Sequence, residues 1–197
     1  MDESTLDMAQ RDQPMVPHAP EIQDQGHERT EPQPTRKANN SGSVQIRLAK
    51  TAEDLQALAE IGVDAVAESP TLSRYAYDAE RMWRKAQDRL KKEPNRHALI
   101  IAELDGKLVG FLWAQVGGHL FVDARSAQCL VFYVSPEHRN GLAAIKLLKG
   151  YQRWAEQQGC DTIALHVTSG ARMKTTDRLL RKMGFTQVGG NYEKGMI

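Results

Sequence analysis

The chain has 197 residues, which suggests one domain, or one domain with an appendage. A hydrophobic fraction of 41% allows a buried core, and 26 basic against 25 acidic residues leave a net charge of only +1, which argues against binding nucleic acid through overall charge. Cys129 and Cys160 lie far apart and show no metal-ligand spacing, so no metal site or disulfide framework is readable. Because no apolar run approaches the roughly 20 residues of a membrane span and the first residues lack an apolar segment, we expect a reduced, cytoplasmic protein.

Residues 1–43 differ in composition from the rest of the chain. They contain no Phe, Tyr or Trp, five of the eight prolines, and eight acidic against four basic side chains, so they carry −4 and the remainder carries +5. Such a segment cannot bury enough apolar surface to offset the entropy of ordering it. We therefore expect an acidic, proline-rich tail at 1–43, disordered or extended to bind a partner, and a folded domain at 44–197.

The first part of the domain is predicted to be a strand and two helices. A period-2 alternation over residues 44–49 indicates a half-buried strand. Thr51 and Asp54 have the spacing of a capping box, and apolar residues then recur at helical spacing until Glu68, which precedes a Ser-Pro pair. A second amphipathic pattern over 78–92 predicts another helix.

The second part is predicted to alternate strands and helices. Two apolar runs joined by Asp105-Gly106 form a hairpin signal, and residues 127–134 are apolar almost throughout, as expected for a central strand covered on both faces. The segments after this strand are predicted to be a helix ending near Gly159, a strand at 161–167, a helix at 173–183 and a final strand at 184–197. This order predicts an α/β (α+β) fold with a mixed sheet and helices on both sides.

The clearest functional signal follows the central strand. The strand ends at Val134, a proline-marked turn follows, and the run Arg139-Asn140-Gly141-Leu142-Ala143-Ala144 opens a helix. Small residues at a helix start let a ligand approach the backbone, whose N–H groups and positive dipole end favour a phosphate. Arg139 adds a mobile cation. The alternative is that Gly141 is only a turn residue.

These residues resemble the signature of the GCN5-related N-acetyltransferase (GNAT) superfamily, V-x-P-x-x-R-x-x-G-x-G/A, and the resemblance covers about residues 44–197. The corresponding residues are Val134, Pro136, Arg139, Leu142 and Ala144. A later landmark, a helix that leads into a Gly-Phe pair, is matched by Leu179 to Phe185. The loop most resembles divergent members found in phage genomes. The superfamily fold implies a mixed, mostly antiparallel central sheet.

Two positions depart from the superfamily pattern. Leu142 stands where the first glycine of the motif is usual, so the loop has fewer glycines than the common form. Leu180 stands where many members have a tyrosine that is thought to protonate the leaving thiolate. The general acid is therefore missing or supplied elsewhere.

The resemblance implies acetyl-CoA as the cofactor and direct transfer of its acetyl group, in a ternary complex, to a primary amine of a protein or small molecule. It implies that the pantetheine arm pairs with the backbone around Phe132 to Val134, and that the backbone near Tyr133 polarises the thioester carbonyl. The cofactor-binding residues implied are Phe132, Val134, Arg139, Asn140, Gly141, Leu142, Ala143 and Ala144.

An incoming amine must lose a proton, so a base is expected within reach of it. The catalytic candidates are Glu68 at the end of the first helix, Tyr133 on the central strand, and His166 in the strand after the long helix. Each also has an ordinary structural explanation. Glu68 can be a solvated carboxylate at a helix end, Tyr133 a packed core residue, and His166 a structural histidine whose hydrogen bonds are satisfied. Cys129 is predicted to be core. Tyr75, Tyr77 and Trp83 are candidates for lining an acceptor pocket, and the helical spacing of Trp83 favours the core as its alternative.

Other functions stay open at this point. A GNAT-shaped binding module that has lost catalysis and recruits a partner through the tail is the main alternative, because the loop has few glycines and Leu180 replaces the tyrosine. A modifier of nucleic acid is a third hypothesis, suggested by the +5 domain, although no pattern of stacking aromatics supports it. A homodimer is also left open.

Overall fold

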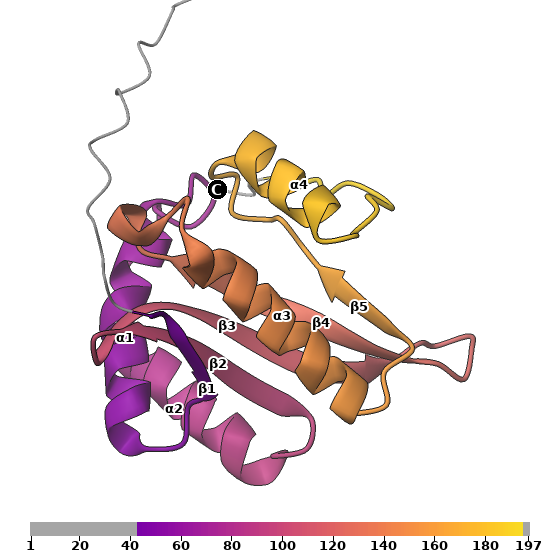
Figure 1. The fold of residues 1–197 in the computed structure, drawn as a ribbon, viewed down its shortest axis with the longest axis horizontal. Helices are drawn as coiled ribbons and strands as arrows, with labels where there is room; N and C mark the ends of the chain where they lie inside the picture. Colours follow the sequence, from indigo (N-terminus) through magenta and orange to yellow (C-terminus); the bar gives the residue numbers. More distant parts are fainter. Residues whose placement is uncertain (1–42, 195–197) are drawn as a thin grey trace, which may run out of the picture. The chain divides into compact units, whose positions relative to one another are not determined.

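The structure is a computed structural model and describes residues 43–194 (Figure 1). These residues belong to one structural unit. The tail predicted at 1–43 lies, except for Ser43, outside the described residues. The elements in chain order are β1 (Gln45–Leu48), α1 (Ala52–Ala67), α2 (Ala79–Lys92), β2 (His97–Leu104), β3 (Lys107–Gly118), β4 (Arg125–Val134), the 3-10 helix η1 (Pro136–His138), α3 (Leu142–Gln157), β5 (Thr162–Leu165) and α4 (Met173–Lys182).

The five strands form one sheet in the order of the sequence. The pairs β1–β2, β2–β3 and β3–β4 are antiparallel, whereas β5 joins β4 in parallel. The sheet is therefore mixed and mostly antiparallel, which confirms the predicted fold class. Asp105 and Gly106 form the turn between β2 and β3 with φ angles of 51° and 75°, the left-handed pair that suits the twist of a tight hairpin.

Helices cover both faces of the sheet (Figure 1). The residues of β2 that point to one face, such as Ile100, pack with α3, while those that alternate with them, such as Leu99, pack with α1 and α2. Leu180 brings α4 to the same side as α3. None of the helices within residues 43–194 is long and apolar enough to cross a membrane.

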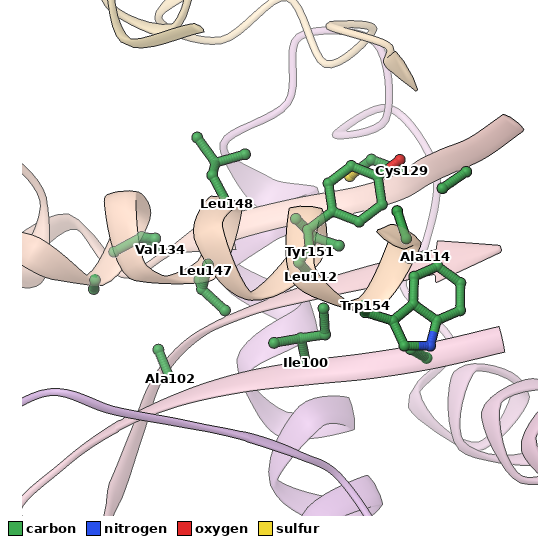
Figure 2. Close-up of a cluster of buried hydrophobic side chains, with 14 of the residues drawn as sticks. Ile100, Ala102, Leu112, Ala114, Cys129, Val134, Leu147, Leu148, Tyr151 and Trp154 are labelled. Atoms are coloured by element: carbon green, nitrogen blue, oxygen red, sulfur yellow. The ribbon is translucent and has the colours of Figure 1, made fainter. Parts of the chain in front are cut away.

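The α3 side of the core fixes this helix over the middle of the sheet (Figure 2). Leu147, Leu148 and Tyr151 are completely buried. The Tyr151 hydroxyl also donates a hydrogen bond to the carbonyl of Ala164 in β5, at 3.0 Å. Because α3 is anchored to the sheet by this row of side chains, the position of its N-terminus relative to the end of β4 is set by core packing.

A bulge divides β4 into two halves. Trp113 of β3 pairs with Val131 and Ala114 pairs with Cys129, so Leu130 is the extra residue. β5 pairs with β4 only over Ser126–Cys129, on the other side of the bulge. Within residues 43–194, the half of β4 from Leu130 to Val134 has no strand partner on the edge away from β3.

Two predictions about strands are wrong. The final strand predicted at 184–197 is absent from its described part, because residues 185–194 form neither helix nor strand. Phe185 packs against the α3 core, but Val188 and Tyr192 are almost fully exposed, so no alternating face of this segment is buried to favour a strand. The strand predicted at 161–167 is shorter, and His166 lies just beyond the end of β5.

The capping box predicted at the start of α1 is confirmed, with Thr51 as N-cap. The Asp54 carboxylate also accepts two hydrogen bonds from the Arg47 guanidinium, at 2.6 and 2.9 Å, and one from the backbone N–H of Lys50 at 2.7 Å. Arg47 lies on β1 and pairs with Glu103 of β2 as well. This network ties the first turn of α1 to the edge of the sheet.

Replacing Asp54→Ala should lower the free energy of unfolding at pH 6 by about 2 kcal/mol, because the variant loses a helix cap and a charge-assisted pair. The hydrogen bonds from Arg47 hold the pKa of Asp54 well below its ordinary value. A carboxyl with a depressed folded pKa contributes stability above its unfolded pKa of about 3.9 and loses it as the pH falls further. The difference in the free energy of unfolding between wild type and variant should therefore decrease as the pH falls from 4 to 2.

Urea unfolding at pH 6 and pH 3 measures this gap. Glu60→Gln, on the exposed side of α1, is the matched control and should leave stability within about 0.5 kcal/mol at both values. A gap for Asp54→Ala that is equally large at pH 3 would contradict the role assigned to the ionised carboxylate.

Candidate active site

The candidate site lies at the carboxyl end of β4, where the chain turns into α3. After Val134 the chain forms η1, and Gly141 becomes the N-cap of α3. Asn140 takes a φ of 63°, a left-handed conformation that asparagine adopts more readily than most residues. This turn brings the first residues of α3 back to the sheet next to the free half of β4.

The N-terminus of α3 carries no capping side chain. α1 and α2 begin with the side-chain caps Thr51 and Asp78 and have acidic residues in their first turns, whereas α3 has neither feature. The first turn of α3 contains the small residues Ala143 and Ala144. Its N–H groups and the positive end of its dipole are therefore available to an anion such as a phosphate.

The free half of β4 leads directly to this helix end. Over residues 130–134 its outer edge presents backbone hydrogen-bonding groups to an added extended chain, as in strand addition. One carbonyl of this segment, that of Val134, already accepts a hydrogen bond from Arg139 Nε at 2.7 Å. An amide-bearing arm followed by a pyrophosphate fits such an edge and helix end, so the residues present fit coenzyme A.

Glu68, the C-cap of α1, joins this end of β4 from the other face of the sheet. Its Oε1 accepts a hydrogen bond from the Tyr133 hydroxyl at 3.0 Å, and its Oε2 pairs with the Arg139 guanidinium at 2.7 Å. The guanidinium also lies over the Tyr133 ring, 5.4 Å from its centre. Two of the three catalytic candidates, Glu68 and Tyr133, are thus in direct contact and share Arg139 as a neighbour.

The Tyr133 phenol is protonated at neutral pH. Its side chain belongs to the cluster packed under α1 and α2, and only 7% of the residue is exposed. Burial raises the pKa of Tyr133 well above its ordinary value of about 10, and the hydrogen bond to Glu68 raises it further. A protonated phenol donates a hydrogen bond and does not accept a proton, so Tyr133 is suited to positioning Glu68.

Arg139 is not the mobile cation expected from the sequence. Its guanidinium is held by Glu68 and by the Val134 carbonyl, and its side chain is only 18% exposed. The sequence pattern places Arg139 in the loop correctly but contains no information on the carboxylate that captures its side chain. That the backbone of residues 139–144 holds a pyrophosphate stays a prediction.

His166 is not part of the cluster. It is exposed and lies outside β5, and no hydrogen bond or ion pair within residues 43–194 joins it to Glu68 or Tyr133. Its catalytic role stays a prediction. In the described part of the chain, no group of three or more His, Cys, Asp or Glu residues is placed to hold a metal ion.

Two further residues considered for the chemistry, Leu180 and Cys129, are part of the hydrophobic core. Leu180, at the position of the usual tyrosine, is 9% exposed and packs in the α3 cluster. Cys129 is buried as predicted, and burial raises the pKa of its thiol to about 12, so it is not a thiolate nucleophile.

The sequence did not predict a contact next to Glu68, between the loop after α1 and the segment after β5. The loop after Glu68 hydrogen-bonds to the connection between β5 and α4, through Ser69 Oγ to the Ser169 carbonyl at 2.9 Å and Thr71 Oγ1 to the Thr168 carbonyl at 3.3 Å. The Ser-Pro pair after Glu68 signals only the end of a helix, and nothing local indicates a partner about 100 residues away.

Residues 63–185 match the family model described as the acetyltransferase (GNAT) family. The chain belongs to this family. GNAT acetyltransferases use acetyl-CoA, which agrees with the fit of the β4 edge and the α3 N-terminus. No curated protein sequence matches the chain, so the family assignment rests on the family model and the fold.

Several solved structures share the fold of this GNAT domain. A transcriptional regulator from Bacillus halodurans C-125 has a TM-score of 0.63 at 22% identity, over 78% of this chain and 100% of that one. AAC(6')-Iy in complex with a CoA bisubstrate analogue has a TM-score of 0.61 at 18% identity, over 78% and 99%. A ribosomal-protein-alanine N-acetyltransferase from Brucella melitensis biovar Abortus 2308 has a TM-score of 0.60 at 19% identity, also over 78% and 99%. At these identities the similarity shows the fold.

The contact between Glu68 and Arg139 should be worth more than a surface ion pair, because both side chains are partly buried and carry further hydrogen bonds. A double-mutant cycle with Glu68→Gln and Arg139→Gln should give a coupling energy of about 1–2 kcal/mol in urea unfolding. The exposed pair of Asp88 and Lys92 on α2 is the control and should give about 0.5 kcal/mol or less. Equal coupling in both pairs would contradict the cluster.

Proposed function

We propose that the protein is an N-acetyltransferase that transfers the acetyl group of acetyl-CoA directly to a primary amine. The observation that carries this proposal is the position of Glu68, which is held by Tyr133 and Arg139 at the end of the same strand whose free edge and following helix fit the cofactor. The family gives the cofactor. Among the structural relatives, the names of AAC(6')-Iy and the ribosomal-protein-alanine enzyme indicate amine acceptors, which supports an amine here.

The cofactor side of the proposed site is made almost entirely of backbone. Phe132 to Val134 would pair with the pantetheine arm, and the N–H groups from Gly141 to Ala144 would hold the pyrophosphate. When bound, acetyl-CoA supplies the activated acetyl group. A backbone N–H near Tyr133 is proposed to stabilise the negative charge that develops on the carbonyl oxygen, and one such donor contributes roughly 2.7–4 kcal/mol.

The acceptor side is proposed to be Glu68 with Tyr133. The two donors that hold the Glu68 carboxylate occupy one site on each oxygen, and a carboxylate has about four lone-pair sites. The remaining sites can accept a hydrogen bond from the N–H of an amine and direct its lone pair. Tyr133 and Arg139 keep the carboxylate in one orientation, which is the positioning part of catalysis.

Leu180 supplies no proton from α4. A thiol with an ordinary pKa of about 8.5 leaves as a thiolate far more easily than an alcohol or amine leaves, so the loss of an acid at this position is compatible with turnover.

An alternative function is a GNAT-fold binding module without catalysis, which recruits a partner through residues 1–43. It is favoured by the burial of Leu180 in the core and by Leu142, which places a large apolar side chain at the helix start, where it is 59% exposed. This alternative expects no acetyl transfer to any amine.

Acetyl-CoA at 100 times its dissociation constant should stabilise the wild-type protein by roughly 2.7 kcal/mol, which raises the thermal midpoint by several degrees. Leu142→Asp should weaken binding at least about tenfold, because it places a negative charge at the first turn of α3. The same charge is favourable to the helix dipole, so the thermal midpoint without ligand should be unchanged or higher.

Thermal unfolding with and without acetyl-CoA measures both effects, and Leu142→Asn is the uncharged control. If millimolar acetyl-CoA leaves the wild-type midpoint unchanged, the enzyme proposal fails. If Leu142→Asp binds as well as wild type, the pyrophosphate is not held at this helix.

Glu68→Gln should lower kcat/KM for the amine by about 10- to 100-fold, because a hydrogen bond to a charged group is worth about 1.5–3 kcal/mol. The dissociation constant of acetyl-CoA should stay within about twofold of wild type, because the amide oxygen of the glutamine can still accept the Arg139 hydrogen bond that holds the loop before α3. Release of free CoA measures the turnover, and Glu60→Gln serves as the control. A Glu68→Gln enzyme with unchanged kcat/KM would remove Glu68 from the reaction.

A further inference from the structure

A groove lies between β1 and α3, at the edge of the sheet opposite to β5 (Figure 1). It has a volume of about 530 Å³, and its lining is apolar on the side of β1, through Val44 and Ile46, and mostly charged on the side of α3. The proposed cofactor site uses the first turn of α3 and the carboxyl half of β4. The groove is therefore a separate surface that the proposed chemistry does not use.

The two walls of the groove run side by side in the same direction. The Lys146 ammonium donates a hydrogen bond to the Val44 carbonyl at 2.6 Å. One turn later Gly150 lies against Ile46, and a Cβ at this glycine would be 3.1 Å from the Ile46 side chain. A larger residue at position 150 would push α3 away from β1, so Gly150 sets the width of the groove.

Within residues 43–194, one edge of β1 has no strand partner. β1 pairs only with β2, and the hydrogen bond from Ala49 N to the Leu99 carbonyl continues this ladder. Because backbone groups alternate in direction along an antiparallel ladder, the N–H and C=O of Ile46 and the N–H of Leu48 point away from β2. Leu48 is also 41% exposed. An extended polypeptide can therefore add to β1 as a further strand.

Cations line the α3 side of this edge. Lys146, Lys149 and Arg153 follow one another at spacings of three and four residues, which places them on one stripe of the helix. Three basic side chains against one acidic side chain, Glu156, give the lining a net charge of +2. Lys149 and Arg153 are exposed and make no hydrogen bond or ion pair within residues 43–194. Their charges are available to an anionic partner.

The spacing of these cations fits an extended chain. Lys149 and Arg153 are separated by about 6 Å along the helix axis, at 1.5 Å per residue. Side chains on one face of a strand are about 6.8 Å apart. A strand added to β1 would thus place every second side chain next to the basic stripe, where carboxylates pair with the cations.

Two other occupants fit the groove less well. A second copy of the chain that paired through β1 about a two-fold axis would bring two identical basic stripes together. A nucleic acid strand would match the charge, but the described residues that line the groove include no aromatic side chain on which bases could stack.

We infer that this groove binds an acidic, extended segment of another polypeptide, which adds to β1 as a strand and directs alternate Asp or Glu side chains to Lys149 and Arg153. The free edge gives affinity through the peptide backbone, and the basic stripe selects the sequence. The partner is recognised by acidic residues at every second position.

The probe is a peptide of about eight residues that alternates Glu and Thr, since Thr favours the extended conformation. Both of its ends are blocked, so it contains no amine and cannot act as an acetyl acceptor. Calorimetric titration into the full chain at low ionic strength should give a dissociation constant below about 100 µM. The full chain is used so that the acidic side chains of residues 1–43 are present in every comparison.

Reversing the two exposed charges tests the basic stripe. Lys149→Glu with Arg153→Glu should weaken binding of the Glu peptide at least about tenfold, and this variant should bind the same peptide with Lys in place of Glu at least about tenfold more tightly than wild type does. Arg81→Glu with Lys85→Glu is the matched control, because these cations are exposed at the same spacing on α2, on the other face of the sheet. The rise in thermal midpoint caused by acetyl-CoA should be equal in all three proteins.

Backbone methylation tests the added strand. N-methyl groups on one set of alternate residues of the Glu peptide should abolish binding, whereas N-methyl groups on the other set should change the dissociation constant less than about threefold. Only one set of N–H groups faces β1 in a strand. A peptide of the same composition with its Glu residues grouped at one end should bind at least about tenfold more weakly.

Several outcomes would overturn the inference. No binding to the full chain, or unchanged binding by Lys149→Glu with Arg153→Glu, would remove the groove as the site. Equal binding of both N-methylated peptides would exclude strand addition. Tighter binding of a single-stranded RNA of equal charge would assign the groove to nucleic acid, and a dimer that the charge reversal dissociates would assign it to a second copy. The response to acetyl-CoA tests the proposed acetyltransferase function separately from all of these outcomes.

Discussion

The site depends on β4 continuing past the point where β5 stops pairing with it. The bulge at Leu130 marks that point, and beyond it the strand is held on one edge by β3 and left free on the other. In a sheet of regular pairing this edge would be covered. Here the core packing of α3 over β2, β3 and β4 keeps the strand in place without β5. The packing of α3 thus holds the unpaired edge of β4 in place. A ligand can pair with this edge without displacing another strand.

Glu68 connects the two faces of the sheet at this edge. α1 is held to the sheet at its N-terminus by Asp54 and at its C-terminus by the contacts of Glu68 with Tyr133 and Arg139. Because Arg139 also belongs to the loop that starts α3, a displacement of that loop changes the environment of the carboxylate. The geometry of the acceptor side and that of the cofactor side are therefore not independent. Arg139 was expected to contact the phosphate. Its side chain instead contacts Glu68 and Tyr133, on the face of the sheet covered by α1 and α2.

Local patterns were sufficient for most of the fold. Thr51 and Asp54 predicted the start of α1, Asp105-Gly106 predicted the hairpin, and the apolar run that ends at Val134 predicted the central strand. Each signal is confined to a few neighbouring residues. A final strand was also predicted at 184–197, but a strand needs a partner and a buried face, and the exposed Val188 has neither. The pairing of Glu68 with Arg139 and the docking of Ser69 on residue 169 join positions about 70 to 100 residues apart, and no periodicity records such contacts.

Of the two departures from the superfamily motif, Leu142 falls where the backbone is expected to act, and Leu180 falls where a side chain is expected to act. Leu142 occupies the first helical position of α3, whose N–H groups are present whichever side chain follows them. Leu180 removes an acid, but its burial strengthens the packing of α4 on the α3 core. Both changes leave the free edge of β4 and the helix dipole intact. What Leu180 removes is a side chain that could protonate the leaving thiolate.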